Sequence, residues 1–527
     1  MIIISAMNES KSEIQSFYKN KTIFITGATG FMGKVLIEKL LYSCSDLNKI
    51  YILMRDKKDH SCDNRLEDMF KLPLFQRIRT EQPQVLKKEI PFNGDICSDN
   101  LGLTDEEREQ LINEVNIIFH CAACLRMNAK LKNAVEMNMN GTKRILNLGK
   151  VMKHLQAFIH LSTVFCHTDQ KEIGERIYDT SNDPEDIMRL VQCLDEDTID
   201  LITPKLIHPH PNTYTYSKHL AEKLVANEFP ELPCCIARPS IVFPSYKEPL
   251  PGWVDNLNGP VGLFVGVGKG IIKSIICNDN LYIEIIPVDL AINDLIIIAY
   301  KIATSLRNSK SILVVNMTSQ IDTIRITWSE VWKKNKQLLY EYPFEGQIWY
   351  PNGTLLHSNI FVHNIIVLFF QIIPAYFIDF LMLIFGQKRF MVRIQKRILD
   401  NVAILRYFIT RQWILYNKNI ITLCNDITPL DKQIFPTMVY NVDEMEYFKH
   451  AILGMRQYCM KEDLSTLPKA RRRQKMIYIL HITMIFLFHF GVLYFIYNNV
   501  ETVRFFLDYV TEKIKSIPFI GRFIQHV

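Results

Sequence analysis

The chain has 527 residues, of which 48% are hydrophobic and 22% are charged. This length exceeds what one hydrophobic core usually supports, so we expect two or three folding units. Much of the net charge of +6 comes from one basic cluster, residues 469–475, which directly precedes an apolar segment. A cluster in that position indicates membrane topology and excludes a nucleic-acid partner as its explanation.

The 12 cysteines show neither disulfide nor zinc spacing, which favours a reduced, cytosol-facing working domain. Cys121 and Cys124 have the spacing of a redox pair, but they follow a predicted strand instead of opening a helix. We therefore interpret them as small buried residues. His208 and His210 alternate with prolines in a segment without a carboxylate cluster. We interpret that segment as a stiff loop and expect no metal site.

The first folding unit begins after residues 1–20, which are predicted to form a flexible arm. Residues 22–26 are an apolar, β-branched run typical of a buried parallel strand, and an apolar pattern of helical period follows three spaced glycines. Gly27 permits a tight turn, Gly30 lets the backbone approach a pyrophosphate, and Gly33 lets the helix pack closely on the strand.

This strand, turn and helix predict a dinucleotide site in which the pyrophosphate lies on the free N–H groups at the helix N-terminus. A glycine turn without a ligand is the alternative, but the flanking strand and helix are the context that the motif requires. The predicted contacts are Thr26, Gly27, Thr29, Gly30, Phe31, Met32 and Gly33.

The second predicted strand, residues 50–54, bears on the choice between NAD and NADP. A carboxylate at its tip suits the ribose 2′-OH of NAD, whereas a basic residue suits the 2′-phosphate of NADP. Arg55 together with Lys57 or Lys58 therefore favours NADPH. Asp56 is the competing ribose ligand if the strand runs further. A solvated charge run without a ligand is the third interpretation.

Strands and helices alternate up to residue 163. We predict a third strand at residues 89–96, a fourth at 115–120 and a fifth at 158–163, with a helix at 130–153 before the fifth. Small residues after the fourth strand leave room for a ligand at the crevice of the sheet. This alternation predicts an α/β fold with a parallel, doubly wound Rossmann sheet.

Tyr214 and Lys218 are four residues apart at the start of a predicted helix, so they share one face. A lysine ammonium beside the phenol is expected to lower the tyrosine pKa and make it a proton donor, and Lys218 can also hold the nicotinamide ribose. Ser162 or Thr163, at the end of the fifth strand, can donate a second hydrogen bond to a substrate carbonyl. A Tyr-x-x-x-Lys is common by itself, but after a glycine turn and a strand-end hydroxyl it is the layout of the short-chain dehydrogenase/reductase superfamily.

A closer resemblance involves several further segments. The chain resembles the fatty acyl-CoA reductases in five segments of its first 300 residues, and it is also similar to that family's C-terminal domain at residues 348–351 and 390–413. The five segments are residues 26–33, 212–218, 238–242, 248–260 and 286–289. Two departures are Val164-Phe165, where the family tends to have Ala-Tyr, and residues 441–447, which lack an expected tryptophan.

The resemblance implies that Tyr214 and Lys218 are catalytic, that Thr163, in preference to Ser162, is the hydroxyl partner, and that Asn138 belongs to a proton relay. It also implies that NADPH is held by the glycine turn and Arg55, with Asp95 and Ile96 flanking the adenine. The implied reaction is reduction of a long-chain acyl-CoA to an aldehyde and then to a primary alcohol, with release of CoA. A dehydrogenase of sterols or other lipid ketones, and a dinucleotide-binding scaffold without chemistry, are the alternatives.

The predicted organisation has a reductase domain with a smaller substrate lobe, a helical C-terminal domain, a transmembrane helix and a short tail. Within the lobe, Trp253 is interpreted as a core residue rather than a ligand. The sequence carries no signal for an oligomeric state. The predicted bounds are 21–300 for the reductase domain, 355–460 for the helical domain, 476–497 for the transmembrane helix and 498–527 for the tail.

Two stretches suggest membrane lipid as a partner. Residues 359–385 are strongly apolar but contain Pro374 and Asp379, which suits a membrane-dipping hairpin or an acyl-chain groove, with a full span as the alternative. Residues 387–413 read as an amphipathic helix that could lie on the membrane face. Its basic residues are Lys388, Arg389, Arg393, Lys396 and Arg397.

Residues 476–497 contain no Asp, Glu, Lys or Arg and predict a transmembrane helix, with a buried core helix as the alternative. The basic cluster before it places the enzyme body in the cytosol and residues 498–527 across the membrane. The C-terminal residues carry no retention or peroxisomal signal. The endoplasmic reticulum is the favoured location, and the peroxisomal membrane is the second.

Overall fold

The computed structural model describes residues 12–56, 60–307, 309–318, 326–351, 354–437, 443–499 and 501–515. Its centre is a seven-stranded sheet in the order β11-β7-β5-β4-β1-β2-β3, in which every neighbouring pair is parallel. The strands are β1 (Thr22–Thr26), β2 (Lys49–Met54), β3 (Glu89–Asn93), β4 (Ile117–His120), β5 (Ala157–Leu161), β7 (Cys234–Pro239) and β11 (Leu313–Met317).

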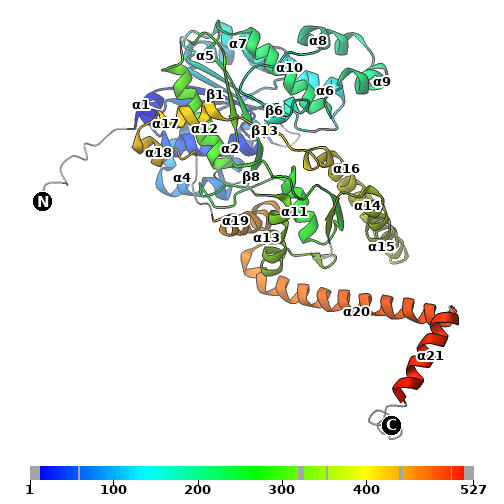
Figure 1. Cartoon of the computed structure of the whole chain (residues 1–527). Coiled ribbons are helices and arrows are strands. Elements are labelled where there is room, and N and C mark those ends of the chain that lie inside the picture. The colour runs from blue at the N-terminus through cyan, green and yellow to red at the C-terminus, as the bar shows by residue number, and fades with distance from the viewer. Residues whose placement is uncertain are drawn as a thin grey trace, which may run out of the picture.

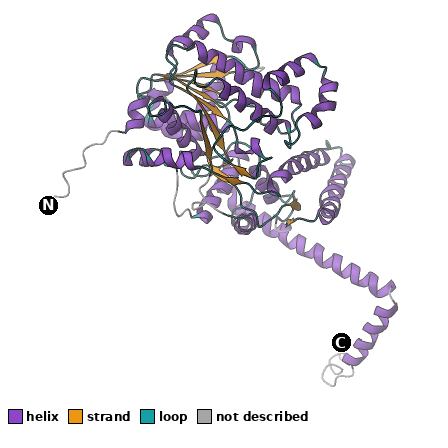
Figure 2. Cartoon of the chain, turned by 45° about the horizontal axis from the view of Figure 1, so that its top comes forward, coloured by secondary structure: helices purple, strands orange, loops and turns teal. Residues whose placement is uncertain are grey.

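The strand order reverses between β1 and β4, which is where a doubly wound sheet opens its ligand crevice. Helices cover both faces of the sheet (Figures 1 and 2). One face packs against α2 (Phe31–Ser43), α12 (Val288–Ala303) and α17 (Lys418–Asn425). The other face packs against α7 (Gly141–Val151) and α10 (Thr213–Asn227). The α/β Rossmann prediction is therefore confirmed.

The sheet continues beyond the predicted boundary at residue 300. β7 follows α10 in the chain, and β11, at Leu313–Met317, pairs with β7. α12 lies between these two strands in sequence and packs on the sheet. The third strand ends at Asn93 rather than at residue 96, because the chain turns there and the Asp95 N–H donates to the Leu101 carbonyl.

The prediction of a flexible arm over residues 1–20 is wrong for residues 12–20. Glu13–Tyr18 form a short helix, α1, and Ile14 and Tyr18 are fully buried. The Tyr18 hydroxyl donates to the Ile296 carbonyl at 3.0 Å. The Ser12 hydroxyl donates at 2.5 Å to the carboxylate of Asp431, a residue that is 419 positions further along the chain. This distant partner orders the segment, and local sequence does not reveal it.

A second core forms the substrate lobe. It contains α11 (Pro260–Gly268), α13 (Trp328–Glu341) and α19 (Glu444–Gly454), together with two short parallel pairs of strands. These pairs are β8 (Ile241–Phe243) with β10 (Ile285–Pro287) and β9 (Ser274–Ile276) with β12 (Leu355–His357).

Two residues explain how the lobe is attached to the sheet. Asp289, at the start of α12, accepts backbone hydrogen bonds from Tyr246 and Lys247 at 2.8 Å and from Glu248 at 3.1 Å, which fixes the chain as it enters the lobe. Trp253 is 1% exposed and packs on the Tyr458 ring, so it is a core residue as predicted.

The helices of residues 355–460 contribute to both cores. Ile420 and Leu423 of α17, and the segment after α18 (Pro429–Ile434), pack into the sheet's core. Tyr447 and Phe448 of α19 belong to the core of the lobe.

The apolar stretch 359–385 forms one continuous helical segment. It consists of α14 (Ile360–Val367), a π-helical turn at Leu368–Ile372 and α15 (Ile373–Ile384). Pro374 lies in the first turn of α15, after the π turn, where its missing N–H is tolerated. Asp379 accepts the backbone N–H groups of residues 390–392, which begin α16 (Met391–Ile409). Neither residue interrupts the helix.

α20 (Leu467–Asn499) is a single helix of 33 residues, followed by α21 (Glu501–Lys515). By length and composition, the described chain has two helices able to cross a membrane, Ile360–Ile384 and Leu464–Asn499. The second contains the predicted span 476–497. The last 12 residues of the predicted tail lie outside the described residues.

Candidate active site

The glycine turn has the geometry of a phosphate cradle. Gly27 has φ +73°, and a Cβ at this position would lie 2.6 Å from the Ala122 backbone nitrogen, at the end of β4. A Cβ at Gly33 would lie 2.4 Å from the Gly27 carbonyl oxygen. The predicted roles of these two glycines, a tight turn and close packing, are confirmed.

The N-terminus of α2 is available to an anion. Gly30 is its N-cap, and no side chain caps the helix there, so N–H groups of the first turn remain available to a ligand. Phe31 and Met32 form the first turn, and Lys34 donates to the Thr29 carbonyl at 3.0 Å while pairing with Asp255 of the lobe. These features fit the pyrophosphate of a dinucleotide.

At the tip of β2, the two candidate ribose ligands, Arg55 and Asp56, have different surroundings. Arg55 has a 59% exposed side chain and lies 3.2 Å from the Asp95 carboxylate. Asp56 is occupied locally, because its carboxylate accepts the Cys62 N–H at 2.8 Å and the Asn93 amide at 2.9 Å. Lys57 and Lys58 lie outside the described residues.

Asp95 and Ile96 lie where the third strand turns away from the sheet. The Asp95 carboxylate accepts the Cys97 N–H at 3.0 Å in addition to its contact with Arg55. Ile96 is 5% exposed, and its side chain lies 3.0 Å from where a Cβ on Gly141 would be. Asp95 therefore lies beside the tip of β2, and Ile96 packs against the start of α7.

Tyr214 and Thr163 meet at the end of β5. Asn212 caps α10 through its side chain, which accepts the Thr215 N–H at 2.9 Å, and this places Tyr214 in the first turn. The Tyr214 phenol is half-buried and lies beside the Thr163 hydroxyl, which donates to the Pro239 carbonyl at 3.5 Å. The Ser162 hydroxyl instead lies 3.7 Å from the Cys166 sulfur. Of the two predicted hydroxyls, the structure therefore brings only Thr163 to Tyr214.

Lys218 does not lower the pKa of Tyr214, contrary to our expectation. Its ammonium reaches past the phenol and donates to the Leu161 carbonyl, at the end of β5, at 2.7 Å. Burial raises the pKa of Tyr214 above its ordinary value, and the neighbouring Thr163 hydroxyl only partly opposes this. Burial lowers the pKa of Lys218 to about 8. Tyr214 is therefore a protonated donor at neutral pH, and Lys218 remains mostly charged.

Asn138 lies in a π-helical turn, Glu136–Asn140, next to α10. Its side-chain amide donates to the Ser217 hydroxyl at 2.9 Å, and its side-chain oxygen accepts the Cys124 N–H at 2.7 Å. Its backbone carbonyl accepts the Thr142 hydroxyl at 2.7 Å. Asn138 thus joins α10 to the loop after β4.

A buried hydrogen-bond chain that sequence analysis did not find continues from this turn. The Thr142 hydroxyl lies 3.0 Å from His120 Nε2, and His120 Nδ1 lies 2.7 Å from the Thr26 hydroxyl. Burial lowers the pKa of His120 to about 3, so this imidazole is neutral. These hydrogen bonds link the residue before the glycine turn, Thr26, to Asn138. The sequence signal that could have indicated these bonds is His120 itself, a histidine in the last position of a strand next to the predicted ligand site.

A buried ion pair joins α10 to β7. Glu222, one turn after Lys218, receives two hydrogen bonds from Arg238, at 2.8 and 2.6 Å, and lies 2.9 Å from His167. Among the described residues, Cys166, His167 and Glu222 form the one group with metal-ligand spacing. Because Arg238 occupies the Glu222 carboxylate, this group fits an ion pair rather than a metal ion.

An open cavity of about 670 Å³ lies between β9 and α16. Two arginines, Arg406 and Arg411, line it together with Tyr407 and Asn278. The end of α16 approaches the turn after β5, because the Phe408 ring packs on Phe165 with the centroids 5.5 Å apart. Local sequence did not predict this cavity, because its walls are distant in the chain.

The family is decided by the relatives that share most of the chain. A family model of an NAD-binding domain, described as "Male sterility protein", matches residues 25–295, and a second model with the same description matches residues 370–462. Fatty acyl-CoA reductase 1 of Homo sapiens is 36% identical over 459 residues, which cover 87% of this chain and 88% of that protein. The chain belongs to the fatty acyl-CoA reductase family.

A second fatty acyl-CoA reductase, named wat, of Drosophila melanogaster is 34% identical over 481 residues and covers 91% of this chain. Two solved structures share the fold at low identity. One is the terminal R domain from the myxalamid PKS-NRPS biosynthetic pathway, with a TM-score of 0.55, 16% identity, and coverage of 84% of this chain and 93% of that one.

The other is the reductase domain of a nonribosomal peptide synthetase from Mycobacterium tuberculosis, with a TM-score of 0.54, 15% identity, and coverage of 83% of this chain and 93% of that one. As a fatty acyl-CoA reductase family member, the chain is an oxidoreductase with a nicotinamide-dinucleotide-binding domain and a fatty acyl substrate.

Proposed function

We propose that the protein reduces long-chain acyl-CoA to the primary alcohol through the aldehyde, uses NADPH, releases CoA and is anchored in a membrane. The observation that carries the proposal is the pair formed by Tyr214 and Thr163 at the carboxyl end of β5, with Lys218 behind it. Two neighbouring hydroxyl groups, either of which can donate, suit a carbonyl oxygen on which negative charge develops.

The residues of the chain perform complementary tasks in this mechanism. Thr163 and Tyr214 hydrogen-bond the thioester oxygen, and the bound nicotinamide supplies the hydride. When the tetrahedral adduct collapses, the CoA thiolate leaves and the aldehyde remains. In the second reduction, Tyr214 transfers its proton to the alkoxide, and we assign its reprotonation to Lys218, while Asn138 holds α10 against the loop after β4. Lys218, with a pKa of about 8, carries most of its positive charge at pH 7.

The cavity beside α16 is our candidate site for the CoA portion of the substrate. Its two arginines, Arg406 and Arg411, suit the phosphates, because guanidinium groups bind phosphate oxygens in pairs. The contact between Phe408 and Phe165 links this wall to the turn after β5, which carries Thr163. An acyl-CoA could therefore lie with its thioester at Tyr214 and its phosphates at α16.

The preference for NADPH is supported by the tip of β2. Replacing Arg55 with alanine should lower kcat/KM for NADPH by about 10–100-fold, because one hydrogen bond to a charged group contributes about 1.5–3 kcal/mol. The value for NADH should remain nearly unchanged, and the same variant assayed with NADH is the matched control. Equal losses with both cofactors would show that Arg55 does not contact a 2′-phosphate.

Membrane anchoring is supported by α20. Its window of highest hydropathy has none of its residues buried in the protein, so the alternative of a buried core helix is not favoured. The basic cluster at 469–475 precedes this window and places the catalytic body in the cytosol. We propose the endoplasmic reticulum as the location, with the peroxisomal membrane as the second candidate.

The reaction is tested on membranes from cells that express the full chain. With NADPH and a C16 acyl-CoA, we expect the C16 alcohol, free CoA and two NADPH oxidised per alcohol. Aldehyde with one NADPH oxidised would mean that reduction stops after one step. If no acyl-CoA of any length is consumed while NADPH binds, lipid ketones are the next substrates, and inertness with those would favour the scaffold.

A further inference from the structure

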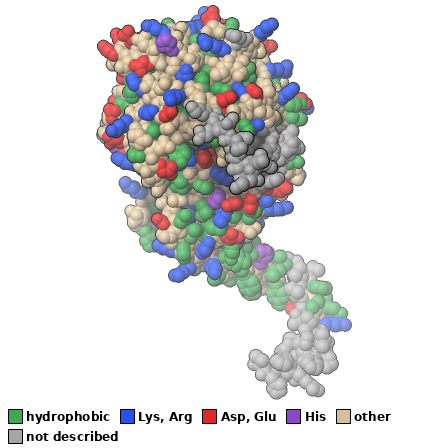
Figure 3. All heavy atoms as spheres, turned by 90° about the vertical axis from the view of Figure 1, so that its left-hand side faces the viewer, with side chains coloured by type: hydrophobic (Ala, Val, Ile, Leu, Met, Phe, Trp, Pro, Cys, Tyr) green, Lys and Arg blue, Asp and Glu red, His purple; other side chains and the backbone are tan. Residues whose placement is uncertain are grey.

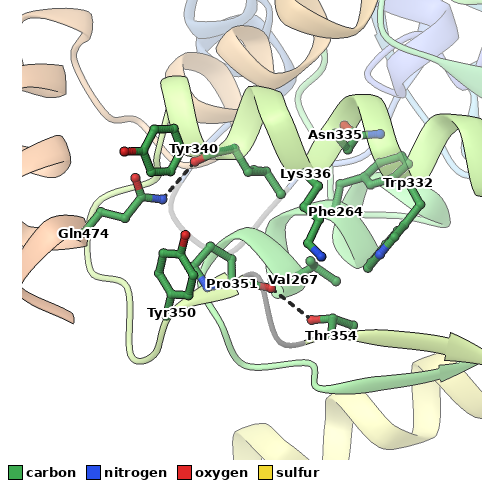
Figure 4. A pocket seen from close by; sticks show the side chains of 11 residues that line it. Phe264, Val267, Trp332, Asn335, Lys336, Tyr340, Tyr350, Pro351, Thr354 and Gln474 are labelled. Atoms are coloured by element: carbon green, nitrogen blue, oxygen red, sulfur yellow. Dashed lines mark hydrogen bonds between the residues drawn. The ribbon is translucent and has the colours of Figure 1, made fainter. Parts of the chain in front are cut away.

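The first half of α20 docks on the lobe before the helix leaves the body. Its buried and half-buried residues, Ala470, Gln474, Ile477 and His481, recur at helical spacing, so one face is docked for three turns. Gln474 donates to the Leu339 carbonyl at 3.0 Å, next to a small cavity of about 20 Å³ (Figure 4). From residue 482 to 495, every residue of the helix is exposed.

Two aromatic residues of the lobe lie against the last docked turn. The Trp349 indole donates to His481 at 3.1 Å, and the Tyr350 ring lies 4.9 Å from the Tyr478 ring. Tyrosine and tryptophan are the residues that concentrate at membrane interfaces. Residues 476–497 are about 33 Å long as a helix and match a hydrocarbon core of about 30 Å, whereas residues 482–497 alone reach only about 24 Å. A helix that spans the full hydrocarbon core therefore has to include residues 476–481, which are docked on the lobe. The edge of the lobe at Trp349 then lies at the membrane surface.

The segment α14–α15 is held at that same edge. The Gln371 side chain, in its π turn, accepts the Lys273 N–H of the lobe at 2.6 Å, and the Lys273 ammonium donates to the Tyr350 carbonyl at 3.0 Å. His363 lies 2.9 Å from the Ser274 hydroxyl. α14–α15 and α20 therefore emerge from the lobe end of the molecule (Figure 1).

The outer face of α14–α15 has no protein partner among the described residues. Phe361, Phe370, Tyr376 and Phe385 are each at least 62% exposed. Further exposed apolar side chains are Ile360, Val362, Ile365, Leu368, Phe369, Ile373, Phe377, Phe380, Leu381, Leu383 and Ile384. On the side of the molecule away from α14–α15, Figure 3 shows charged groups over the upper body and hydrophobic side chains gathered at the lower end toward α20.

We propose that α14–α15 is a second membrane contact, lying in the cytosolic leaflet with its outer face among the acyl chains. Its occupant is a phospholipid bilayer, because the proposed span in α20 brings the same edge to the membrane. α16 packs against α15 and exposes basic residues that match anionic headgroups. Those charges keep α16 out of the hydrocarbon. Because α15 packs on α16, both helices lie in the plane of the membrane and do not cross it. The inference rests on the proposed anchor in α20.

This seating connects the membrane to the active site. α16 begins at the Asp379 carboxylate of α15 and ends with Phe408 on Phe165, two residues after Thr163. A substrate whose acyl chain dissolves in the leaflet would enter along this helix pair. In this arrangement, the proposed catalytic residues lie near the membrane leaflet in which the acyl chain of the substrate dissolves.

The test uses the full chain in vesicles of phosphatidylcholine and phosphatidylserine with a photo-crosslinking amino acid at one position. Replacing Phe377, 59% exposed on α15, should give crosslinks to lipid acyl chains comparable to those from Phe486 on α20. Replacing Leu201, 82% exposed on α9 (Glu196–Leu206) at the opposite end of the molecule, should give none. NADPH-dependent turnover of each variant verifies its fold.

Lipid crosslinks from Phe486 without crosslinks from Phe377 would overturn the second contact and leave the anchor intact. Crosslinks from Phe377 to another copy of the chain would replace the bilayer with self-association and also overturn it. If neither position reaches lipid, the anchor in α20 fails together with the inference. A crosslinking residue in place of Phe369, 57% exposed in the π turn, repeats the test if the Phe377 variant does not fold.

Discussion

Replacing Tyr214 with phenylalanine should reduce acyl-CoA turnover by about 10²–10⁴-fold, the usual contribution of a positioned general acid. The variant keeps the ring and loses only the hydroxyl that lies beside Thr163. NADPH binding should stay close to the wild-type value, because the glycine turn, Arg55 and Lys218 are unchanged. Product formation from a C16 acyl-CoA and cofactor fluorescence are the two measurements.

Tyr216 offers a matched control on the same helix. Its ring is 1% exposed, and its hydroxyl accepts a hydrogen bond from the Asn182 amide at 3.0 Å, away from Thr163. Tyr216→Phe should cost about 1 kcal/mol of stability and leave turnover nearly intact. Similar losses in the two variants would mean that Tyr214 acts through packing, and an active Tyr214→Phe enzyme would refute the site assignment.

The second large effect concerns stability. Glu222→Ala should lower the free energy of unfolding by about 3–5 kcal/mol, because it leaves the fully buried Arg238 guanidinium without its counter-charge. Arg238 would keep only its hydrogen bonds to the carbonyls of Gly174 and Arg176. Chemical denaturation of the detergent-solubilised full chain measures the loss. The helix that carries Lys218 is expected to loosen as well, so activity should fall with stability.

Glu228→Ala is the matched control, because Glu228 follows the same helix and pairs with Lys150 at the surface, with side chains 20% and 39% exposed. That change should cost at most about 1 kcal/mol. Equal effects at positions 222 and 228 would contradict a special role for the buried pair.

The same pair should make the wild type sensitive to acid. Burial by itself would raise the pKa of Glu222, but the charges of Arg238 and His167 and their hydrogen bonds bring it well below its usual 4.5. A carboxylate with a lowered pKa contributes stability that is full above its unfolded-state pKa of about 4.3 and is lost as the pH falls through the folded value. Below pH 4, the stability of wild type and Glu222→Ala should therefore converge.

Local sequence was sufficient for the elements of the Rossmann half. Residues 22–26 are apolar and β-branched, Gly27 and Gly33 stand where a side chain would collide with backbone, and the helix pattern follows at once. These signals lie within some 20 residues of one another, so no distant contact was needed to read them. Tyr214 and Lys218 were predicted in the same way, from their spacing on one helix.

Contacts between distant segments decided the rest. The choice between Thr163 and Ser162 as the neighbour of Tyr214 depends on how α10 packs against the end of β5. Lys218 donates to the Leu161 carbonyl because that acceptor lies within reach of its long side chain. α1 is ordered by Asp431, more than 400 residues away in the chain.

The apolar stretch 359–385 shows the same division. Its hydrophobicity was evident from the sequence, but Pro374 and Asp379 predicted interruptions that the fold does not have. The π turn accommodates the proline, and the carboxylate accepts the N–H groups that open α16. Sequence by itself determined which residues are apolar and which carry chemistry. Only tertiary structure decided what each buried polar group pairs with, because hydrogen bonds and ion pairs join segments that are neighbours in space and not in the chain.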